Sequence, residues 1–465
     1  MTDSPTAFFT ASTHERPSER AYAVNLDSQS PLKTRSLFQI PDRATVRSAA
    51  RPTQPPHPTL ADDTEPSLYF AGNSLGLLPL PVQTALHTEL QTWGQRGVLG
   101  HFSHPSHHPW VTVDDNARHL LSPLLGSLPS ETAIMGSLTS NIHLLFAGFY
   151  KPTPQRFKII MEKGAFPSDR YAMLSQIEHH GLNPVDVLVE VTPAPGEKTI
   201  SLDQIKRAID HHANETAVVF FGGVQYLTGQ VLDMASITAY AKHKGVPYVG
   251  FDLAHAVGNI PLELHAWNVD FAAWCSYKYL NAGPGGIAGI FVHEANKDVT
   301  PGFRGWWGHE TGTRFEMTGE FVGEEGAGKW RLSNPSVVDV VALEASLRVF
   351  KEAGGIQTVR EVGKRLTAYL EHLLLTRFPV EEEGGERPFE IVTPEAPWRG
   401  QQLSLRWKEG GVEELEKRLF REGVVVDTRR PDVVRVSPAP LYNSFADVWD
   451  FVDALKKVVD AEKKQ

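Results

Sequence analysis

Two groups of polar residues in the middle of the chain follow apolar runs and could act together on an amino group. The run PYVGFD ends at Asp252, with His255 three residues further on, and the run VDFAAWCS is followed by Tyr277 and Lys278. A lysine amine at a strand end can form a Schiff base with an aldehyde cofactor. A carboxylate on a neighbouring strand can keep a pyridine nitrogen of such a cofactor protonated, which makes the ring an electron sink.

Each of these residues also has a plainer interpretation. A single lysine is usually a solvated surface residue, and an aspartate at a strand end often caps a helix. The combination of Asp252 with Ser-Tyr-Lys and the glycine-rich turn NAGPGG is far more specific than either residue alone. We therefore predict that Asp252 and Lys278 share one site.

The surrounding sequence predicts the elements that must position this site. Between about residues 130 and 295, short β-branched or aromatic runs alternate with helical stretches. This alternation predicts an α/β fold with a mostly parallel sheet, whose ligands bind beyond the carboxyl ends of the strands. Further on, residues 337–378 predict a long helix, and the short strands that follow predict a smaller α+β domain.

The domain prediction has three parts. Residues 1–66 are predicted to form an N-terminal arm and a loop insertion, and within them the Pro- and Thr-rich stretch 42–66 is expected to have little internal structure. Residues 67–335 are predicted to form a large cofactor-binding α/β domain. Residues 336–465 are predicted to form the small α+β domain.

Composition excludes several other classes of protein. The 465 residues contain 45 Lys and Arg against 55 Asp and Glu, a net charge of -10, so nucleic acid is not an expected partner. The single cysteine, Cys275, excludes a disulfide framework and a multi-thiolate metal site. No stretch approaches the ~20 apolar residues of a membrane span, and the N-terminus lacks the pattern of a signal or transit peptide. A cytoplasmic location is therefore expected.

A histidine-rich tract, HFSHPSHHP, contains His101, His104, His107 and His108 and invites a metal interpretation. Its prolines prevent a helical ligand face, and no carboxylate or thiolate lies nearby in the sequence. We therefore expect loop histidines here and predict no metal ion.

From about residue 22 to the C-terminus, the chain resembles the kynureninases, a family of fold-type I pyridoxal-phosphate enzymes in the class V aminotransferase branch. The motifs that carry this resemblance are YFAGNSLGLLP, GSLTSNIHLLFAGFYKPT, EKGAFPSDRYA, YLTGQ, GFDLAHAVGNIPL, WCSYKYLNAGPGG, GWWGHE, RLSNPS and VRVSPAPLYNS. The chain departs from some relatives at Gly222, where a small hydroxyl residue is expected. The resemblance implies a fold-type I large domain with pyridoxal 5'-phosphate as cofactor.

The resemblance also implies roles for individual residues. Lys278 would be the Schiff-base lysine, Asp252 the partner of the pyridinium nitrogen, and Tyr277 a phosphate ligand that could also relay a proton. Phe166 would stack on the cofactor ring. The implied cofactor-binding residues are Leu138, Thr139, Phe166, Pro167, Ser168, Asp169, Gly222, Asp252, His255, Tyr277, Lys278, Trp306 and Asn334.

The implied substrate is L-kynurenine or 3-hydroxy-L-kynurenine, cleaved to anthranilate or 3-hydroxyanthranilate and L-alanine in tryptophan degradation and NAD synthesis. Arg435 would bind the α-carboxylate, and Ser74 and His101 would lie near the aromatic amine. Trp306 and Asn334 would reach the site from the partner subunit of a homodimer.

Three alternatives remain at this point: a class V aminotransferase, a cysteine or selenocysteine lyase, and a non-catalytic cofactor-binding scaffold. The lyase is disfavoured because Cys275 lies three residues before Lys278, where a thiol is expected to be buried and inert.

Overall fold

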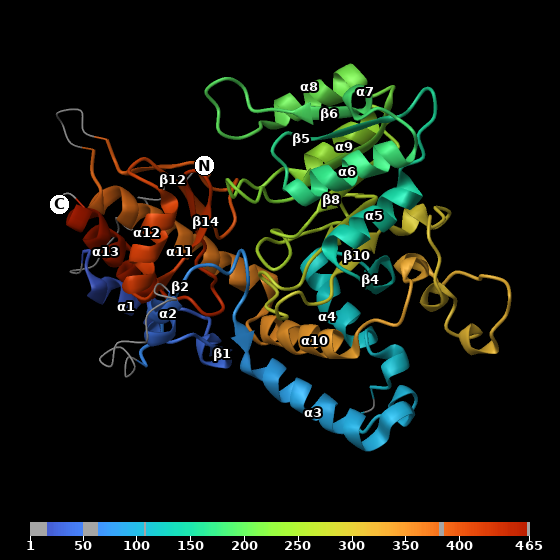
Figure 1. Cartoon of the computed structure of the whole chain (residues 1–465), viewed down its shortest axis with the longest axis horizontal. Helices are drawn as coiled ribbons and strands as arrows, with labels where there is room; N and C mark the ends of the chain where they lie inside the picture. The colour runs from blue at the N-terminus through green and yellow to red at the C-terminus, as the bar shows by residue number, and fades with distance from the viewer. Residues whose placement is uncertain (1–15, 50–63, 107, 381–385, 463–465) are drawn as a thin grey trace. The chain divides into compact units, whose positions relative to one another are not determined.

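A computed structural model describes residues 16–49, 64–106, 108–380 and 386–462 (Figure 1). The chain forms two compact units, which we call the large unit and the small unit. The large unit comprises Pro81–Tyr226 and Val231–Lys351; the small unit comprises Met1–Leu80, Leu227–Gln230 and Glu352–Gln465. The domain boundaries after residues 66 and 335 stay predictions from the sequence.

The large unit contains a seven-stranded sheet and the helices that cover it. Its strands are β4 (Thr132–Ile134), β5 (Lys158–Glu162), β6 (Leu188–Val191), β7 (Thr216–Gly222), β8 (Tyr248–Asp252), β9 (Phe271–Trp274) and β10 (Gly289–Val292). Its α-helices are α3 (Leu80–Arg96), α4 (Asp115–Leu125), α5 (Leu138–Phe149), α6 (Pro167–His179), α7 (Pro184–Val187), α8 (Leu202–His212), α9 (Met234–His243) and α10 (Val337–Glu352).

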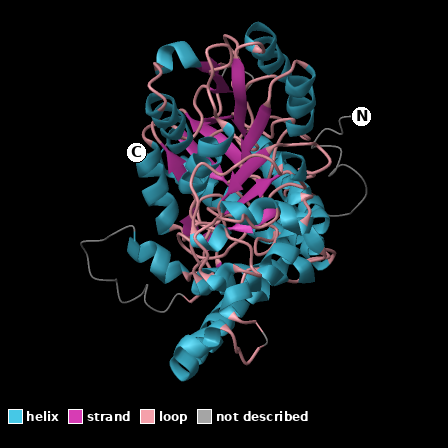
Figure 2. Ribbon diagram, turned by 90° about the vertical axis from the view of Figure 1, so that its right-hand side faces the viewer, coloured by secondary structure: helices cyan, strands magenta, loops and turns pink. Residues whose placement is uncertain are grey.

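The strand order of this sheet is β4-β10-β9-β8-β7-β5-β6, and only β10 runs against its neighbours. The expected mostly parallel α/β sheet is thereby confirmed. Right-handed crossovers place α5 and α6 on one face and α8 and α9 on the other, and the strands lie between helices in Figure 2. The chain passes from β5 to the edge strand β6 and then returns to β7 on the other side of β5. The strand order therefore reverses between β5 and β7, and sheets of this class open a ligand crevice at such a point.

Aromatic stacking fixes α5 against this sheet. The ring of Phe149, at the end of α5, stacks on Phe271 of β9 with centroids 4.6 Å apart and on Trp330 with centroids 5.3 Å apart. All three side chains are buried. Large aromatic rings contribute strongly to core stability. The packing of Phe149 therefore fixes the position of the whole helix, including its N-terminal end, which faces the site described below.

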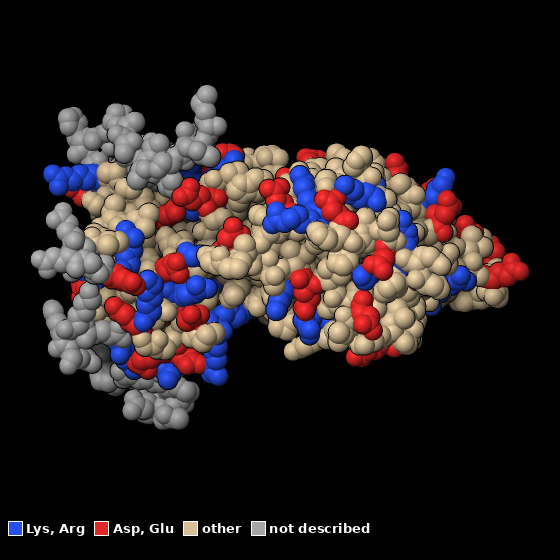
Figure 3. All heavy atoms as spheres, turned by 90° about the horizontal axis from the view of Figure 1, so that it is seen from above, with Lys and Arg blue, Asp and Glu red and all other residues tan. Residues whose placement is uncertain are grey.

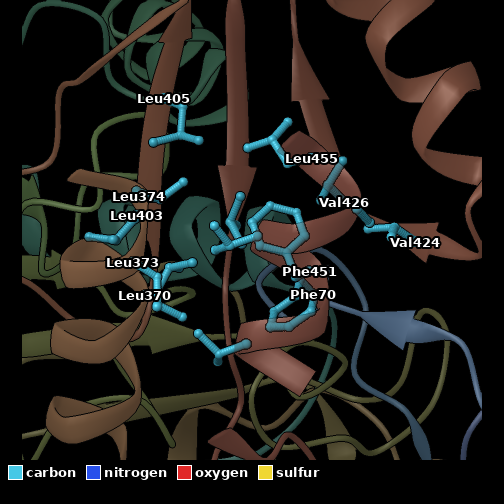
Figure 4. Close-up of a cluster of buried hydrophobic side chains, with 14 of the residues drawn as sticks. Phe70, Leu370, Leu373, Leu374, Leu403, Leu405, Val424, Val426, Phe451 and Leu455 are labelled. Carbon is cyan, nitrogen blue, oxygen red and sulfur yellow. The ribbon is translucent and has the colours of Figure 1, made fainter. Parts of the chain in front are cut away.

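The small unit has its own sheet and core. Its helices are α1 (Arg20–Ser28), α2 (Arg43–Ala49), α11 (Gly355–Arg377), α12 (Val412–Arg421) and α13 (Phe445–Glu462). Its strands are β1 (Phe38–Gln39), β2 (Leu68–Tyr69), β3 (Leu78–Pro79), β11 (Phe389–Ile391), β12 (Leu403–Trp407), β13 (Val424–Val425), β14 (Asp427–Arg429) and β15 (Val433–Val436). Four of them form the antiparallel sheet β11-β12-β15-β14. Figure 4 shows side chains from α11, α13 and β12 packed together with Phe70 and Val424. The ring centroids of Phe70 and Phe451 lie 5.1 Å apart.

Two sequence predictions about helices need correction. The long helix expected over residues 337–378 is divided into α10 and α11, because Gly354 and Gly355 adopt φ of 83° and 80°, which interrupts a right-handed helix. The stretch 42–66 was expected to have little structure, yet Arg43–Ala49 form α2, and the backbone N–H of Thr45 donates to Asp42 at 2.6 Å at its start. Residues 50–63 lie outside the described part.

The charged residues of one face can be seen in Figure 3. Positive and negative side chains are interspersed on the face shown in Figure 3. Within the described ranges, no helix is long and apolar enough to cross a membrane.

Candidate active site

A cavity of about 180 Å³ opens in the large unit where β5, β7 and β8 end. These are the carboxyl ends of parallel strands, the place where this sheet class binds ligands. The lining residues are Ser137, Leu138, Thr139, Glu162, Ala165, Phe166, Asp169, Gly222, Val224, Gln225, Tyr226, Asp252, His255, Tyr277, Lys278, Gly285 and Gly286.

One wall of the cavity is built for an anion. Ser137 precedes α5, and Leu138 and Thr139 form its first turn, whose free N–H groups and dipole favour negative charge. The turn before the helix depends on Gly136, whose φ is 56°, and a Cβ there would come within 2.5 Å of the Asn141 Oδ1 atom. A glycine is therefore required for the chain to enter α5 at this angle.

The first turn of α6 adjoins that of α5. The Thr139 Oγ1 atom lies 2.7 Å from the Ser168 Oγ atom, so a hydrogen bond joins the two helix starts. Phe166 precedes α6, and Pro167 occupies its first position, where the missing N–H costs nothing. The segment Phe166–Asp169 thereby turns from β5 into α6 along the cavity.

Aromatic rings flank the lysine. The Lys278 Nζ atom lies 5.9 Å from the ring centroid of Phe166 and 5.8 Å from that of Tyr277. The Phe166 ring also meets the edge of Tyr226, with centroids 5.2 Å apart and an interplanar angle of 84°. Phe166 is therefore oriented by Tyr226 as one aromatic side of the cavity.

Two buried aspartates lie in the same cavity and interact. Burial raises the pKa of the Asp169 carboxyl well above its usual range, and the neighbouring Asp252 raises it further. Burial also raises the pKa of Asp252, but Lys278 and the Ala254 N–H, which donates to Asp252 Oδ1 at 2.8 Å, oppose that rise. The proton of the pair therefore resides on Asp169, and Asp252 is the carboxylate.

The phenol and the thiol near Lys278 both retain their protons. Burial is the main cause that raises the pKa of Tyr277, with the neighbouring Cys275 adding to it. Burial raises the pKa of the Cys275 thiol as well, and the side chain is only 3 % exposed. The expectation that Cys275 is buried is confirmed, and its thiol is not a reactive nucleophile.

These residues fit pyridoxal 5'-phosphate. The α5 start offers N–H groups to a phosphate, Lys278 offers an amine to an aldehyde, and the Asp252 carboxylate offers an acceptor to a pyridinium nitrogen. The Oδ1 atom of Asp169 is buried in the described structure without a hydrogen-bond partner. A buried polar atom of this kind needs a partner, and a ligand in the cavity that Asp169 lines would bring polar groups near it.

The structure brings most of the predicted cofactor residues together. Leu138, Thr139, Phe166, Asp169, Gly222, Asp252, His255, Tyr277 and Lys278 line the cavity, and Pro167 and Ser168 lie within the same α6 start. At Gly222 an added Cβ would meet only the Val224 carbonyl oxygen, at 3.6 Å. The position where relatives were expected to carry a hydroxyl residue thus has room for one.

Five predicted residues do not line this cavity. Trp306, Asn334 and His101 belong to the large unit, where the Trp306 side chain is 47 % exposed and its Nε1 donates to the Arg314 carbonyl at 2.9 Å. The His101 ring meets the edge of Trp110, with centroids 5.4 Å apart. Ser74 and Arg435 belong to the small unit.

Arg435 is held rigidly within the small unit. It lies on β15, is 1 % exposed, and its Nε and Nη2 atoms lie 2.9 and 2.6 Å from Asp427 Oδ1. A buried guanidinium with a fixed orientation is suited to bidentate recognition of a carboxylate.

The sequence analysis missed Glu162, Gln225 and Tyr226 as cavity residues. Glu162 is the last residue of β5, so the rule that ligands bind at strand ends was the available signal. Gln225 and Tyr226 follow β7 within an irregular loop, where no periodic pattern predicts the direction of a side chain.

Neither group of histidines forms a persuasive metal site. In the histidine-rich tract, His104 is buried and its Nε2 lies 3.2 Å from Glu89, while His107 lies outside the described residues. Glu131, His265 and His293 place ligand atoms within 4.8 Å of one another. The two rings are stacked at an interplanar angle of 6°, so their in-plane lone pairs do not converge on one point.

The large unit thus has the fold and the cavity of a fold-type I pyridoxal-phosphate enzyme. Two solved structures share this fold: a cystine C–S lyase (TM-score 0.70, 18% identity, covering 86% of this chain and 98% of that one) and a cysteine desulfurase from Escherichia coli (TM-score 0.69, 18% identity, 91% and 100%). Residues 155–383 match the family described as aminotransferase class-V.

The sequence matches narrow this class to one family. Residues 359–455 match the kynureninase C-terminal domain. The chain is 46% identical to kynureninase 1 of Aspergillus oryzae, over 96% of this chain and 95% of the relative, and 46% identical to the kynureninase of Sclerotinia sclerotiorum, over 95% and 94%. The chain belongs to the kynureninase family.

Proposed function

We propose that this protein hydrolyses the β,γ carbon–carbon bond of L-kynurenine, of 3-hydroxy-L-kynurenine or of both, and releases L-alanine with anthranilate or 3-hydroxyanthranilate. The observation that carries the proposal is the convergence of Lys278, Asp252 and the α5 start on one cavity in a chain that is 46% identical to a kynureninase over nearly its full length.

Pyridoxal phosphate, when bound, supplies a ring that accepts the electron pair of a breaking bond. Lys278 would provide the amine that anchors the aldehyde and a base for proton transfer. Asp252 would accept the hydrogen bond of the protonated ring nitrogen. The N–H groups at the start of α5 and the Thr139 hydroxyl would bind the phosphate, and Phe166 would pack against the ring.

Tyr277 is suited to proton transfer. Its buried phenol has a raised pKa, so it is protonated at neutral pH and can donate a hydrogen bond to a phosphate or a proton to a leaving carbon. Its ring centroid lies 5.8 Å from the Lys278 amine, and this proximity supports a shared role of the two groups in proton transfer.

The small unit provides the substrate's carboxylate ligand in this proposal. Arg435, oriented by Asp427, binds the α-carboxylate of the amino acid. Ser74 and His101 bind near the aromatic amine end. Kynurenine and 3-hydroxykynurenine differ by one hydroxyl group in this region, so these contacts decide the preference between them.

A homodimer with shared sites is part of the proposal. Trp306 and Asn334 do not line the cavity of their own chain, and Trp306 is 47 % exposed; both act in the site of the partner subunit. Light scattering tests the dimer. Mixing inactive Lys278→Ala dimers with inactive Trp306→Ala dimers should restore activity, because hybrid dimers regain one intact site, and a mixture that stays inactive would refute the sharing.

The proposal is tested with purified protein and pyridoxal phosphate supplied with each candidate substrate. Release of fluorescent anthranilate products and of alanine is expected from the wild type and is lost in Lys278→Ala. A cofactor-loaded wild type that converts neither substrate would overturn the proposal and favour transaminase or lyase chemistry. A protein that takes up no cofactor would favour the scaffold alternative.

This activity belongs to tryptophan degradation and supplies pyridine nucleotide synthesis. We infer a cytoplasmic location from the composition, and cell fractionation tests it: recovery in a membrane or organelle fraction would contradict the inference.

A further inference from the structure

Glu162 is a buried titratable residue of the cavity to which no role has yet been assigned. It ends β5, is 7 % exposed, and lines the cavity together with Asp169, Asp252 and Lys278. Three carboxyl groups therefore share one small space with a single lysine. Buried carboxyls in such proximity cannot all be ionised at low energetic cost, so their proton distribution is a property of the group.

The contacts of Glu162 differ from those of the two aspartates. The side chain of Gln225 hydrogen-bonds Glu162, and the Gln225 Nε2 atom in turn donates to the Gly164 carbonyl at 3.1 Å. This amide joins Glu162 to the loop between β5 and α6 and fixes its direction. Among the described residues, no ion pair involving Glu162 is present, so no cation holds it permanently charged.

Glu162 acts electrostatically on Asp169. The negative charge of Glu162 is one of the causes that raise the pKa of Asp169, beside burial and Asp252. The other charged and titratable groups around the cavity are Tyr226 after β7, Asp252 at the end of β8, His255 after it, and Tyr277 and Lys278 after β9. Of these, Lys278 opposes the rise and Asp252 promotes it.

We propose that Glu162 is a positioning residue whose charge adds to burial and to Asp252 in keeping the shared proton on Asp169, and so helps to leave Asp252 as the carboxylate that faces the cofactor ring. This inference rests on the proposed cofactor and deepens the proposed function. Burial raises the pKa of Glu162 to about 7, opposed by the Gln225 hydrogen bond. Glu162 therefore gains its negative charge as the pH rises through neutrality. Its electrostatic influence on the site is confined to pH values above that transition.

The test is a pH titration of the visible absorbance of the cofactor-loaded protein. In Glu162→Gln the amide keeps the size of the side chain but carries no charge. Loss of a nearby negative charge lowers the pKa of any cation in the cavity, so the absorbance titration is expected to shift to lower pH by about half a unit or more. Below about pH 6, where Glu162 is protonated in the wild type, the two spectra should agree.

Three further variants make this test specific. Glu162→Asp retains a carboxyl group and should restore the wild-type titration at least in part. Glu178→Gln removes the same charge from an exposed position on α6 and should change nothing. Gln225→Met removes the hydrogen bond that lowers the pKa of Glu162, so the charge-dependent part of the titration should move to higher pH; this variant tests the proposal even where Glu162→Gln does not fold.

Each outcome has one meaning. Coincident titrations of wild type, Glu162→Gln and Gln225→Met would overturn the inference while leaving the proposed function intact. If Glu162→Gln changed the absorbance spectrum equally at all pH values, the inference would also be overturned, because a purely structural role of Glu162 would produce such a pH-independent change. A wild type that binds pyridoxal phosphate but does not cleave kynurenine would overturn the proposed reaction and not this inference, since the absorbance titration needs no substrate.

Discussion

The hydroxyl groups of Thr139 and Ser168 lie 2.7 Å apart and join the first turns of α5 and α6 at the cavity. The two helices follow different strands of the sheet, β4 and β5. Their N-terminal N–H groups face one cavity only when both helices are held at this spacing. The hydrogen bond is therefore part of the anion-binding wall.

Thr139→Val and Ser168→Ala should both weaken the binding of pyridoxal phosphate. A hydrogen bond of this kind contributes about 0.5–1.5 kcal/mol, which corresponds to roughly a two- to tenfold increase in Kd. Fluorescence titration of cofactor-free protein measures the change. The control is Ser175→Ala, on α6 with Ser168, whose hydroxyl donates to the Ala172 carbonyl at 3.0 Å. An equal loss in this control would show that the effect is not specific to the cavity.

Gly222 and Gly223 should respond differently to alanine. An added Cβ at Gly222 meets nothing closer than 3.6 Å, whereas at Gly223 it meets the Met234 Sδ atom at 2.9 Å and the Leu253 Cδ2 atom at 3.0 Å. Overpacking of this kind costs about 1–3 kcal/mol, so Gly223→Ala should lower the Tm by roughly 3 °C or more. Gly222→Ala should leave the Tm of the cofactor-free protein nearly unchanged. Equal behaviour of the two variants would contradict the packing described for this loop.

The pairing of His265 with Glu131 should make stability depend on pH. His265 Nδ1 lies 2.9 Å from Glu131 Oε1, and this hydrogen bond raises the pKa of His265. Because the pKa is higher in the folded state, the stabilisation is fully present below the unfolded pKa of about 6.5 and is lost as the pH rises through the folded value. The free energies of unfolding of wild type and His265→Gln, measured by urea denaturation, should differ most near pH 6, by about 1 kcal/mol or less. A gap that widens toward alkaline pH would show the opposite sign.

Arg435→Lys should impair substrate binding more than it impairs the chemical step. Lysine cannot reproduce the two-pronged contact of a guanidinium with a carboxylate, and one charge-assisted hydrogen bond contributes about 1.5–3 kcal/mol, so KM for kynurenine should rise roughly 10- to 100-fold. Steady-state kinetics with the cofactor in excess measures this change. A normal KM with a reduced kcat would remove Arg435 from the role of carboxylate ligand. Arg406→Lys, on the neighbouring strand β12 and paired with Glu390 rather than with Asp427, is the matched control.

Much of the large unit could be predicted from the sequence because its signals are local. The apolar runs that end at Asp252 and before Tyr277 mark buried parallel strands. Parallel topology then requires that the strand ends share one edge of the sheet. This reasoning brought Asp252 and Lys278 to one site, and the family resemblance added Thr139 and Phe166; all four line the cavity.

The amino-acid sequence by itself determined the fold class and the family to which the chain belongs, and it predicted that Lys278 and Asp252 share one site. Only the tertiary structure decided that Glu162 lies in the same cavity as Asp169 and Asp252, and that Gly354 and Gly355 divide a helical pattern. The physical reason is that the pKa of a buried carboxyl depends on its desolvation and on neighbours that are distant in sequence. A helix break depends on backbone angles that the hydrophobic pattern does not record.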